Sequence, residues 1–274
     1  MKIREVLSAL EQFAPLPLQE SWDNAGLQVG LTETEVSGAL LCLDVNEKIV
    51  DEAISKGCNL IVSHHPLLFR GLKQISGRDF VQRCVIKAIK NDICVISMHT
   101  NMDNAWGGVN FKIAEKLGAA TAPLSSPEGD TNVQQQGNEA PSGAVGGAGS
   151  MIVAELPEPM SAADFIQKVK RVFGVECAMC NELLERPIRK VAICGGAGDF
   201  TLPDAIAAGA DAFITGEMHY HVFFDHEQEI QLCVIGHYQS EQFTSEIFRD
   251  IIHKACPGVR TEIAETNTNP IKYI

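Results

Sequence analysis

Hydrophobic and polar positions follow two alternating periods along most of this chain. Apolar residues recur with helical spacing over residues 2–13, and this pattern ends before Pro15. Short apolar runs then alternate with amphipathic stretches. The expected elements are a strand at 39–45, a helix near 47–57, a strand at 60–63, a helix near 79–91, a strand at 93–98 and a helix near 107–118. Strands that alternate with helices predict βαβ units and a mostly parallel sheet, and hence an α/β fold.

The alternation is interrupted once. Residues 121–150 are crowded with Pro, Ser, Gly and Gln, which is typical of a linker or a loop that crosses between domains. The pattern then resumes. The expected elements are an edge strand at 151–156, a helix at 161–173, a strand at 190–194, a helix at 202–209, a strand at 212–215, a helix at 219–227, a strand at 231–235 and a helix at 239–254. This series predicts a second α/β region.

Size and charge exclude some functions. The 274 residues suffice for two domains. A net charge of −13 argues against nucleic-acid or anionic-membrane partners, although bound metal ions would still permit a small anionic substrate. Nine cysteines, mostly in apolar runs, are typical of free thiols in a reducing compartment. The sequence has no signal-peptide core or membrane-spanning stretch, so we expect a cytoplasmic protein.

Two adjacent histidines are the strongest chemical signal. His64 and His65 close the apolar run 59–63 and precede Pro66, which keeps the backbone extended. Consecutive extended residues point to opposite sides, so the two imidazoles suit two neighbouring ions better than one. The carboxyl end of a strand is also where open α/β sheets bind ligands. This segment predicts a two-metal site.

Two other predicted strands end in ligand-type residues. Asp103, with His99 before it, follows one of them, and a carboxylate that bridges two ions is typical of two-metal hydrolytic sites. Taken alone, Asp103 would also suit a turn or a helix cap before Gly107. His237 and Glu241 follow the other strand, four residues apart on one helix face. Alone, this pair would also suit an exposed helix start.

Together these residues predict a ligand set of five. Its members are His64, His65, Asp103, His237 and Glu241. Nitrogen and oxygen donors without thiolate suit two divalent ions such as Zn, Fe, Mn or Co, and five ligands leave positions open for water. Glu217 and His221 follow a fourth strand end and are candidates for proton transfer or for support of the ligands.

Two further motifs carry weaker signals. Cys177 and Cys180 have the spacing of a redox motif but no preceding strand, so inert thiols are expected. The glycines of segment 195–198 follow a strand without the spacing of a dinucleotide-binding loop, and Asp199 would repel phosphate. A tight turn is expected there, with backbone contacts to a substrate as the alternative.

Several segments together resemble the NGG-one-interacting-factor-three-like (NIF-three-like) family, whose bacterial members are called GTP cyclohydrolase 1 type 2 homologues. The matching segments are Trp22–Gly30, Ser63–Phe69, His99–Asp103, Gly107–Asn110, Ile214–Glu217, Gly236–Glu241 and Asn269–Ile271. The resemblance implies a two-domain α/β fold with mixed, mostly parallel sheets flanked by helices. Residues 1–120 and 236–274 would form one domain, and residues 121–235 the other. It also implies a dinuclear metal centre at the five positions and a toroidal homohexamer, a trimer of dimers.

The predicted function is therefore a metal-dependent hydrolase. In its GTP cyclohydrolase form, metal-activated water attacks the carbon between the two nitrogens of the purine imidazole ring, and ring opening and loss of formate follow. Arg70 and Lys73 are the cations near the histidines that are available for a triphosphate. Two alternatives stay open: a non-catalytic, hexameric metal-binding scaffold or regulatory protein, and a two-metal phosphoesterase.

Overall fold

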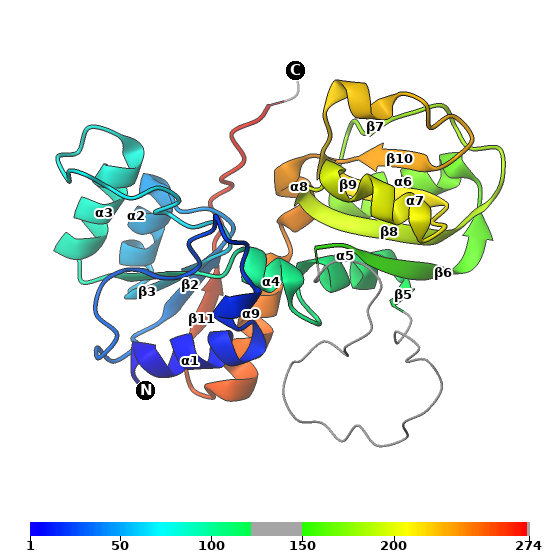
Figure 1. Cartoon of the computed structure of the whole chain (residues 1–274). Helices are drawn as coiled ribbons and strands as arrows, with labels where there is room; N and C mark the ends of the chain where they lie inside the picture. Colours follow the sequence, from blue (N-terminus) through cyan, green and yellow to red (C-terminus); the bar gives the residue numbers. More distant parts are fainter. Residues whose placement is uncertain (122–149, 273–274) are drawn as a thin grey trace. The chain divides into compact units, whose positions relative to one another are not determined.

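A computed structural model of the chain describes residues 1–121 and 150–272 (Figure 1). The chain divides into two compact units. Met1–Ala105 and Thr244–Ile274 form the first unit, and Trp106–Phe243 forms the second. The predicted linker 121–150 lies almost entirely outside the described residues.

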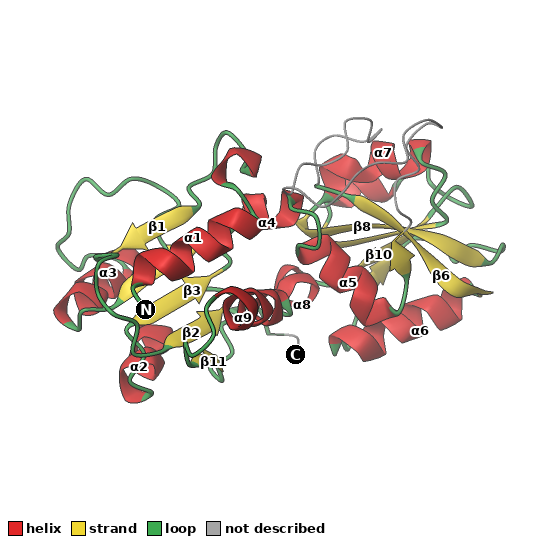
Figure 2. Cartoon of the chain, turned by 90° about the horizontal axis from the view of Figure 1, so that it is seen from below, coloured by secondary structure: helices red, strands yellow, loops and turns green. Residues whose placement is uncertain are grey.

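A five-stranded sheet forms the centre of the first unit. Its strands are, in spatial order, β1 (Gly26–Val29), β4 (Cys94–Ser97), β3 (Leu60–Ser63), β2 (Ala39–Cys42) and β11 (Thr261–Ile263). Only the pairing of β1 with β4 is antiparallel within this sheet. The helices are α1 (Ile3–Phe13), η1 (Leu16–Leu18), α2 (Glu47–Ser55), α3 (Phe80–Lys90), α4 (Thr100–Asn104) and α9 (Thr244–Ala255). Figure 2 shows α1 and α9 on one side of the sheet and α2 and α3 on the other.

Burial on both faces explains the apolar runs of this sheet. All four residues in each of β2, β3 and β4 are buried, as expected for central parallel strands that helices cover on both sides. Side-chain caps set the helix starts. Asn46 accepts a hydrogen bond from the Ile49 amide at the start of α2, and Asp79 accepts one from the Gln82 amide at the start of α3.

The second unit contains a six-stranded mixed sheet. Its strands are, in spatial order, β5 (Ala120–Thr121), β6 (Ile152–Met160), β8 (Ile188–Ala197), β9 (Ala212–Glu217), β10 (Gln231–Val234) and β7 (Met179–Cys180). Only β8, β9 and β10 run parallel to one another in the described sheet. The helices are α5 (Val109–Leu117), α6 (Ala162–Phe173), η2 (Asp199–Thr201), α7 (Leu202–Ala207), η3 (Tyr220–Phe223) and α8 (His237–Glu241). The prediction of an α/β fold with mixed sheets is confirmed, although antiparallel pairings outnumber parallel ones in this second sheet.

The unit boundaries differ from the expected ones at 120/121 and 235/236. Helices α5 and α8 belong to the second unit because α5 packs against β8 and α6, and α8 packs against β8 and β9. The helix predicted at 239–254 is consequently two helices, α8 and α9, and the unit boundary falls between them.

The helix predicted at 219–227 is wrong. Only η3, a short 3-10 helix, forms there. Asp225 adopts a positive φ angle of 64°, which a right-handed helix cannot accommodate. No helix in the described part of the chain combines the length and apolar character needed to cross a bilayer.

Candidate metal-binding site

Three neighbouring parallel strands of the first unit deliver polar residues to one edge of the sheet. Asp44 follows β2, the pair His64 and His65 follows β3, and His99 follows β4. The ends of β3 and β4 are in register, because Ser63 pairs with Ser97. The predicted meeting of strand ends is therefore observed within this unit.

The backbone at the histidine pair is held by its neighbours. The His65 amide donates to the Leu43 carbonyl at 2.9 Å. The Ser63 hydroxyl donates to the His65 carbonyl at 2.9 Å, and the Ser97 hydroxyl reaches the same oxygen at 3.3 Å. These contacts tie the turn after β3 to the strands on either side of it, so both imidazoles start from a fixed backbone.

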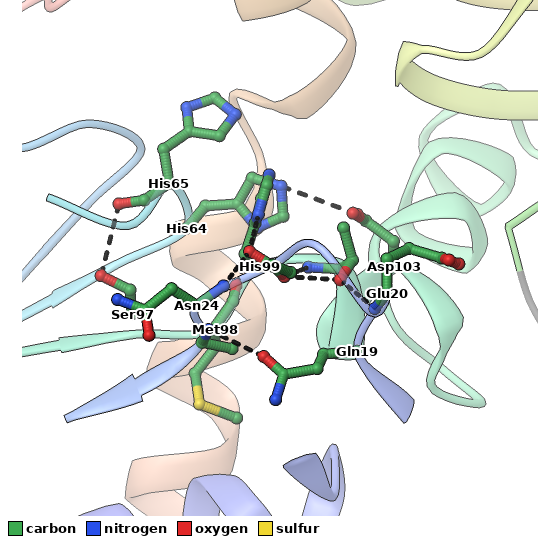
Figure 3. Close-up of polar contacts among 12 residues, drawn as sticks. Gln19, Glu20, Asn24, His64, His65, Ser97, Met98, His99 and Asp103 are labelled. Carbon is green, nitrogen blue, oxygen red and sulfur yellow. Dashed lines mark hydrogen bonds and ion pairs between the residues drawn. The ribbon is translucent and has the colours of Figure 1, made fainter. Parts of the chain in front are cut away.

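The ring of His64 is fully buried and oriented from both sides. Its Nδ1 donates to the Met98 carbonyl at 2.8 Å, which leaves Nε2 as the nitrogen with a lone pair. This Nε2 lies 3.6 Å from Oδ1 of Asp103 (Figure 3). An imidazole nitrogen beside a carboxylate oxygen is a donor pair that suits a divalent cation.

The rings of His65 and His99 are oriented in the same way by carboxylates. His65 Nδ1 lies 2.8 Å from Asp44 Oδ1, and the other Asp44 oxygen accepts a hydrogen bond of 2.6 Å from the Thr268 hydroxyl. His99 Nδ1 lies 2.7 Å from Asp23 Oδ1. Each carboxylate makes Nδ1 the protonated nitrogen, so Nε2 is available as a ligand, as in carboxylate–histidine–metal arrangements.

Asp23 is held as a carboxylate. Burial opposes its ionisation, but hydrogen bonds from His99 and from Thr100 outweigh this effect and lower the pKa of Asp23 to about 2. Asp23 also accepts a hydrogen bond from the Thr100 amide at 3.0 Å. The residue therefore fixes both the ring of His99 and the first turn of α4.

Asp103 lies on α4 instead of in the turn or cap that the isolated motif also allowed. The helix is anchored by two amide side chains that reach the segment after α1. Asn101 Nδ2 donates to the Ala14 carbonyl at 2.7 Å, and Asn104 Nδ2 donates to the Leu18 carbonyl at 2.8 Å. These bonds keep the Asp103 carboxylate beside His64.

The first unit thus contains a compact set of donors. His64, His65 and His99 each offer one ligand atom, and these atoms lie within 4.8 Å of one another. We call these three residues and Asp103 the first-unit cluster. His99 was not in the predicted ligand set. Its position directly after a strand and its spacing from Asp103 were the available signals.

The second unit contributes a ligand pair on a single helical turn. His237 and Glu241 open and close α8, and His237 Nε2 lies 3.2 Å from Glu241 Oε2. Glu241 is buried. The exposed helix start that the isolated motif also allowed is therefore not observed. We call these two residues the second-unit pair.

Glycines make room for Glu241. Gly196 lies within β8 at φ +62°, and a Cβ atom there would collide with the Glu241 carboxylate. A Cβ at Gly216 would lie 2.6 Å from the Gly196 carbonyl oxygen and 2.7 Å from the Ser240 hydroxyl. The tight turn expected at 195–198 is instead a strand end with irregular register. The glycines there serve the packing of α8 on the sheet.

Glu217 and His221 have different surroundings. Glu217 ends β9, and its Oε1 lies 3.0 Å from His237 Nδ1, so it orients the imidazole of the second-unit pair. His221 lies on η3, where its exposed ring contacts the rings of Tyr220 and Phe224. The structure brings Glu217, but not His221, into contact with a predicted ligand of this unit.

The two cysteines with the spacing of a redox motif, which were expected to be inert, have different surroundings. Cys177 is exposed, and Cys180 lies on β7 opposite Cys233 of β10. A hydrogen bond with Cys233 lowers the pKa of Cys180 and raises that of Cys233. All nine thiols are free.

The donors within each unit are of the kinds that divalent metal ions prefer. Each of the four histidines has its Nδ1 held by an oxygen acceptor, and carboxylate oxygens lie near Nε2 of His64 and His237. Nitrogen and carboxylate donors without thiolate suit Zn, Fe, Mn or Co. The chain therefore contains His, Asp and Glu clusters that can bind a metal ion.

Comparisons with known proteins agree with this picture. A family model described as Duf34/NIF3 (NGG1p interacting factor 3) matches residues 1–270. A Clostridium perfringens protein named GTP cyclohydrolase 1 type 2 homolog is 35% identical over 242 residues, which cover 88% of this chain and 87% of the relative. A Clostridium acetobutylicum protein of the same name is 30% identical over 280 residues, which cover 100% and 99%.

Solved structures are similar to this chain over its whole length. A Bacillus cereus protein related to NIF3 superposes with a TM-score of 0.82 at 26% identity, covering 100% of this chain and 99% of that chain. A Staphylococcus aureus protein superposes with a TM-score of 0.85 at 27% identity, with the same coverage.

Proposed function

We propose that this chain, which belongs to the Duf34/NIF3 family, is a hydrolase that depends on two divalent metal ions. The ligands would be His64, His65, Asp103, His237 and Glu241, with His99 as an additional ligand of the first unit. The proposed reaction is that suggested by the relatives' name, GTP cyclohydrolase 1 type 2 homolog. A first water would add to the carbon between the nitrogens of the purine imidazole ring and open the ring to a formamide, and a second water would hydrolyse this formamide and release formate.

The orientation of the imidazoles is the observation that carries this proposal. Nδ1 of His65 and of His99 contacts a carboxylate, and Nδ1 of His64 contacts a main-chain carbonyl. A histidine that only fills the core needs no such uniform orientation. Fixing the tautomer before an ion arrives avoids the cost of ordering three rings on binding.

The side chains of the chain itself would have three tasks in the reaction. Divalent ions, when bound, would supply Lewis acidity and lower the pKa of a coordinated water. Asp103 and Glu241 would balance the positive charge. Glu217 would hold His237 through Nδ1, and it is a candidate for proton transfer. Proton transfer by Glu217 or by His221 stays a prediction that turnover measurements test.

Metal analysis combined with product analysis tests the proposal. Purified protein should contain two divalent ions per chain by elemental analysis, and it should release formate from GTP. His64→Ala should lose metal and turnover together, whereas His253→Ala should keep both. His253 is a matched control because it lies in the same unit and contacts Thr261. Full turnover by metal-free protein would contradict the proposal.

Two other functions would give different results in the same assays. A scaffold would retain metal and hydrolyse no nucleotide, and a two-metal phosphoesterase would release phosphate or a nucleotide instead of formate. The homohexamer built as a trimer of dimers and the cytoplasmic location stay predictions. Light scattering of the eluting protein tests the first, since a hexamer has six times the chain mass of 29.7 kDa.

A further inference from the structure

We propose that Trp22 and Phe69 form an aromatic platform that binds the planar base of a purine nucleotide beside the first-unit cluster. The choice of a purine rests on the proposed function, which this inference deepens by naming the residues that recognise the ring. Phe69 lies shortly after the histidine pair, and Trp22 directly precedes Asp23. Their rings frame one of the three histidines of the cluster.

The exposure of the two rings is the first observation. Trp22 is 58% exposed and Phe69 is 47% exposed, although large aromatic side chains normally bury most of their surface. The ring centroids are 5.9 Å apart and the ring planes meet at 56°, so the rings do not stack face to face. Each therefore keeps surface that a planar ligand can cover.

The position of the two rings is the second observation. The His99 ring lies 6.0 Å from the Trp22 ring and 6.4 Å from the Phe69 ring, in edge-to-face arrangements. The His99 ring also lies 5.3 Å from that of His64. A base stacked on the platform would therefore lie next to the nitrogen donors that we assign to metal binding.

The third observation is that polar side chains hold the two loops of the platform together. Asn24 Nδ2 donates to the Leu68 carbonyl at 2.7 Å, and Gln28 Oε1 accepts from the Leu68 amide at 3.1 Å. Gln28 Nε2 donates to the Asn24 carbonyl at 2.7 Å. The backbone beside both aromatic residues is fixed, so little conformational entropy would be lost when a ligand binds.

The chemistry of the surroundings favours a nucleotide as the ligand. Bases stack on aromatic side chains because every base has a π-face, and each such contact contributes substantially to affinity. Arg70 follows Phe69 directly and is exposed, and Lys73 is exposed nearby in the sequence. These two cations can accompany a phosphate group in a protein whose net charge is −13.

Binding of guanosine 5′-monophosphate to the full-length protein tests the platform without any need for turnover. In a Trp106→Phe background, Trp22 is the remaining tryptophan, because the chain has two. The nucleotide should quench its fluorescence, whereas ribose 5-phosphate and inorganic phosphate should not. Phe69→Leu should weaken nucleotide binding about tenfold by calorimetry, as expected for the loss of one stacking contact. Phe80→Leu, which changes an exposed phenylalanine elsewhere in the unit, should leave the affinity unchanged.

The results separate the platform from the hydrolase. Base-dependent binding that Phe69→Leu weakens, without formate release, would support the platform and count against the hydrolase. Formate release with unchanged affinity in Phe69→Leu and Trp22→Leu would overturn the platform alone. A change of oligomeric state in these variants without a change in affinity would also overturn it, because the rings would then cover another copy of the chain.

Discussion

The two units hold their candidate ligands in different ways. The first-unit cluster combines residues from two adjacent strand ends and a short helix, and buried or carboxylate acceptors orient each of its histidines. The second-unit pair lies on one helical turn, and the carboxylate that orients His237 belongs to Glu217, whose side chain is 54% exposed. Sheet topology therefore fixes the first set, whereas the second depends on local helix geometry and on glycines that let α8 approach the sheet.

Because of this difference, we expect the first-unit cluster and the second-unit pair to contribute unequally to metal affinity. The ligand atoms of the three imidazoles in the first unit lie within 4.8 Å of one another, so these residues can coordinate an ion by themselves. The two donors of the second unit leave most positions of a coordination sphere to water. We therefore expect the first unit to dominate metal retention.

The largest effect is expected for His64→Ala. It removes a fully buried donor from the centre of the first-unit cluster. We expect nearly complete loss of bound metal and of turnover, measured by elemental analysis and by the formate assay. Metal content equal to that of the wild type would contradict the expectation that the first unit dominates metal retention.

Glu241→Gln should have a smaller effect. It weakens the second-unit pair and leaves the first-unit cluster intact, so we expect loss of about half of the bound metal, as follows when one ion of a two-metal site is lost. Elemental analysis and titration of the metal-free protein measure this. A loss as large as that in His64→Ala would show that the two sets contribute equally.

Changes in the residues that orient the histidines come next. Asp44→Asn should reduce metal affinity about 10- to 100-fold, the range expected when the hydrogen-bond partner of a ligating histidine is changed. Glu217→Gln should reduce it less, because water can replace a carboxylate that is 54% exposed more easily than one that is 36% exposed. Asp51→Asn, which changes an exposed carboxylate paired with Lys87, is the matched control. The reverse order of the two effects would argue against a better-ordered first unit.

The smallest expected effect is a pH dependence of stability that comes from Glu52. Burial opposes ionisation of Glu52, but hydrogen bonds from Thr266 and Glu265 and the contact with Lys56 lower its pKa to about 2, below the ordinary value of 4.5. A folded-state pKa below the unfolded-state value means that Glu52 stabilises the fold above pH 4.5, and that this contribution is lost as the pH falls towards 2. Thermal unfolding should therefore separate the wild type from Glu52→Gln at pH 6 and bring them together near pH 2. A constant difference in melting temperature across this range would exclude such a role.

Much of the fold and of the site follows from local patterns. Membership of the Duf34/NIF3 family, inferred from the motifs, is confirmed by the family model and the relatives. The strand 60–63 is identical in prediction and structure, because buried parallel strands read as continuous apolar runs. Parallel strand ends meet at one edge of a sheet, so the sequence alone was enough to predict that His64 and Asp103 lie close together.

What the sequence did not indicate depends on contacts between distant residues. Asp23 contacts His99 across 76 positions, and Asp44 contacts Thr268 across 224. Neither spacing has a local signature. The break between α8 and α9 was missed because helical periodicity continues through residues 239–254 while the chain passes from one unit to the other.

Gly196 is important for the candidate site although it is not a ligand. It carries no side chain, offers no ligand and moves no proton, yet the carboxylate of Glu241 occupies the volume that any other residue would fill. The position of the carboxylate therefore depends on two residues: on Glu241 itself, and on the lack of a side chain at Gly196, forty-five residues earlier. Replacement of Gly196 by a residue with a side chain would displace the Glu241 carboxylate and disable this donor, although Glu241 itself is unchanged.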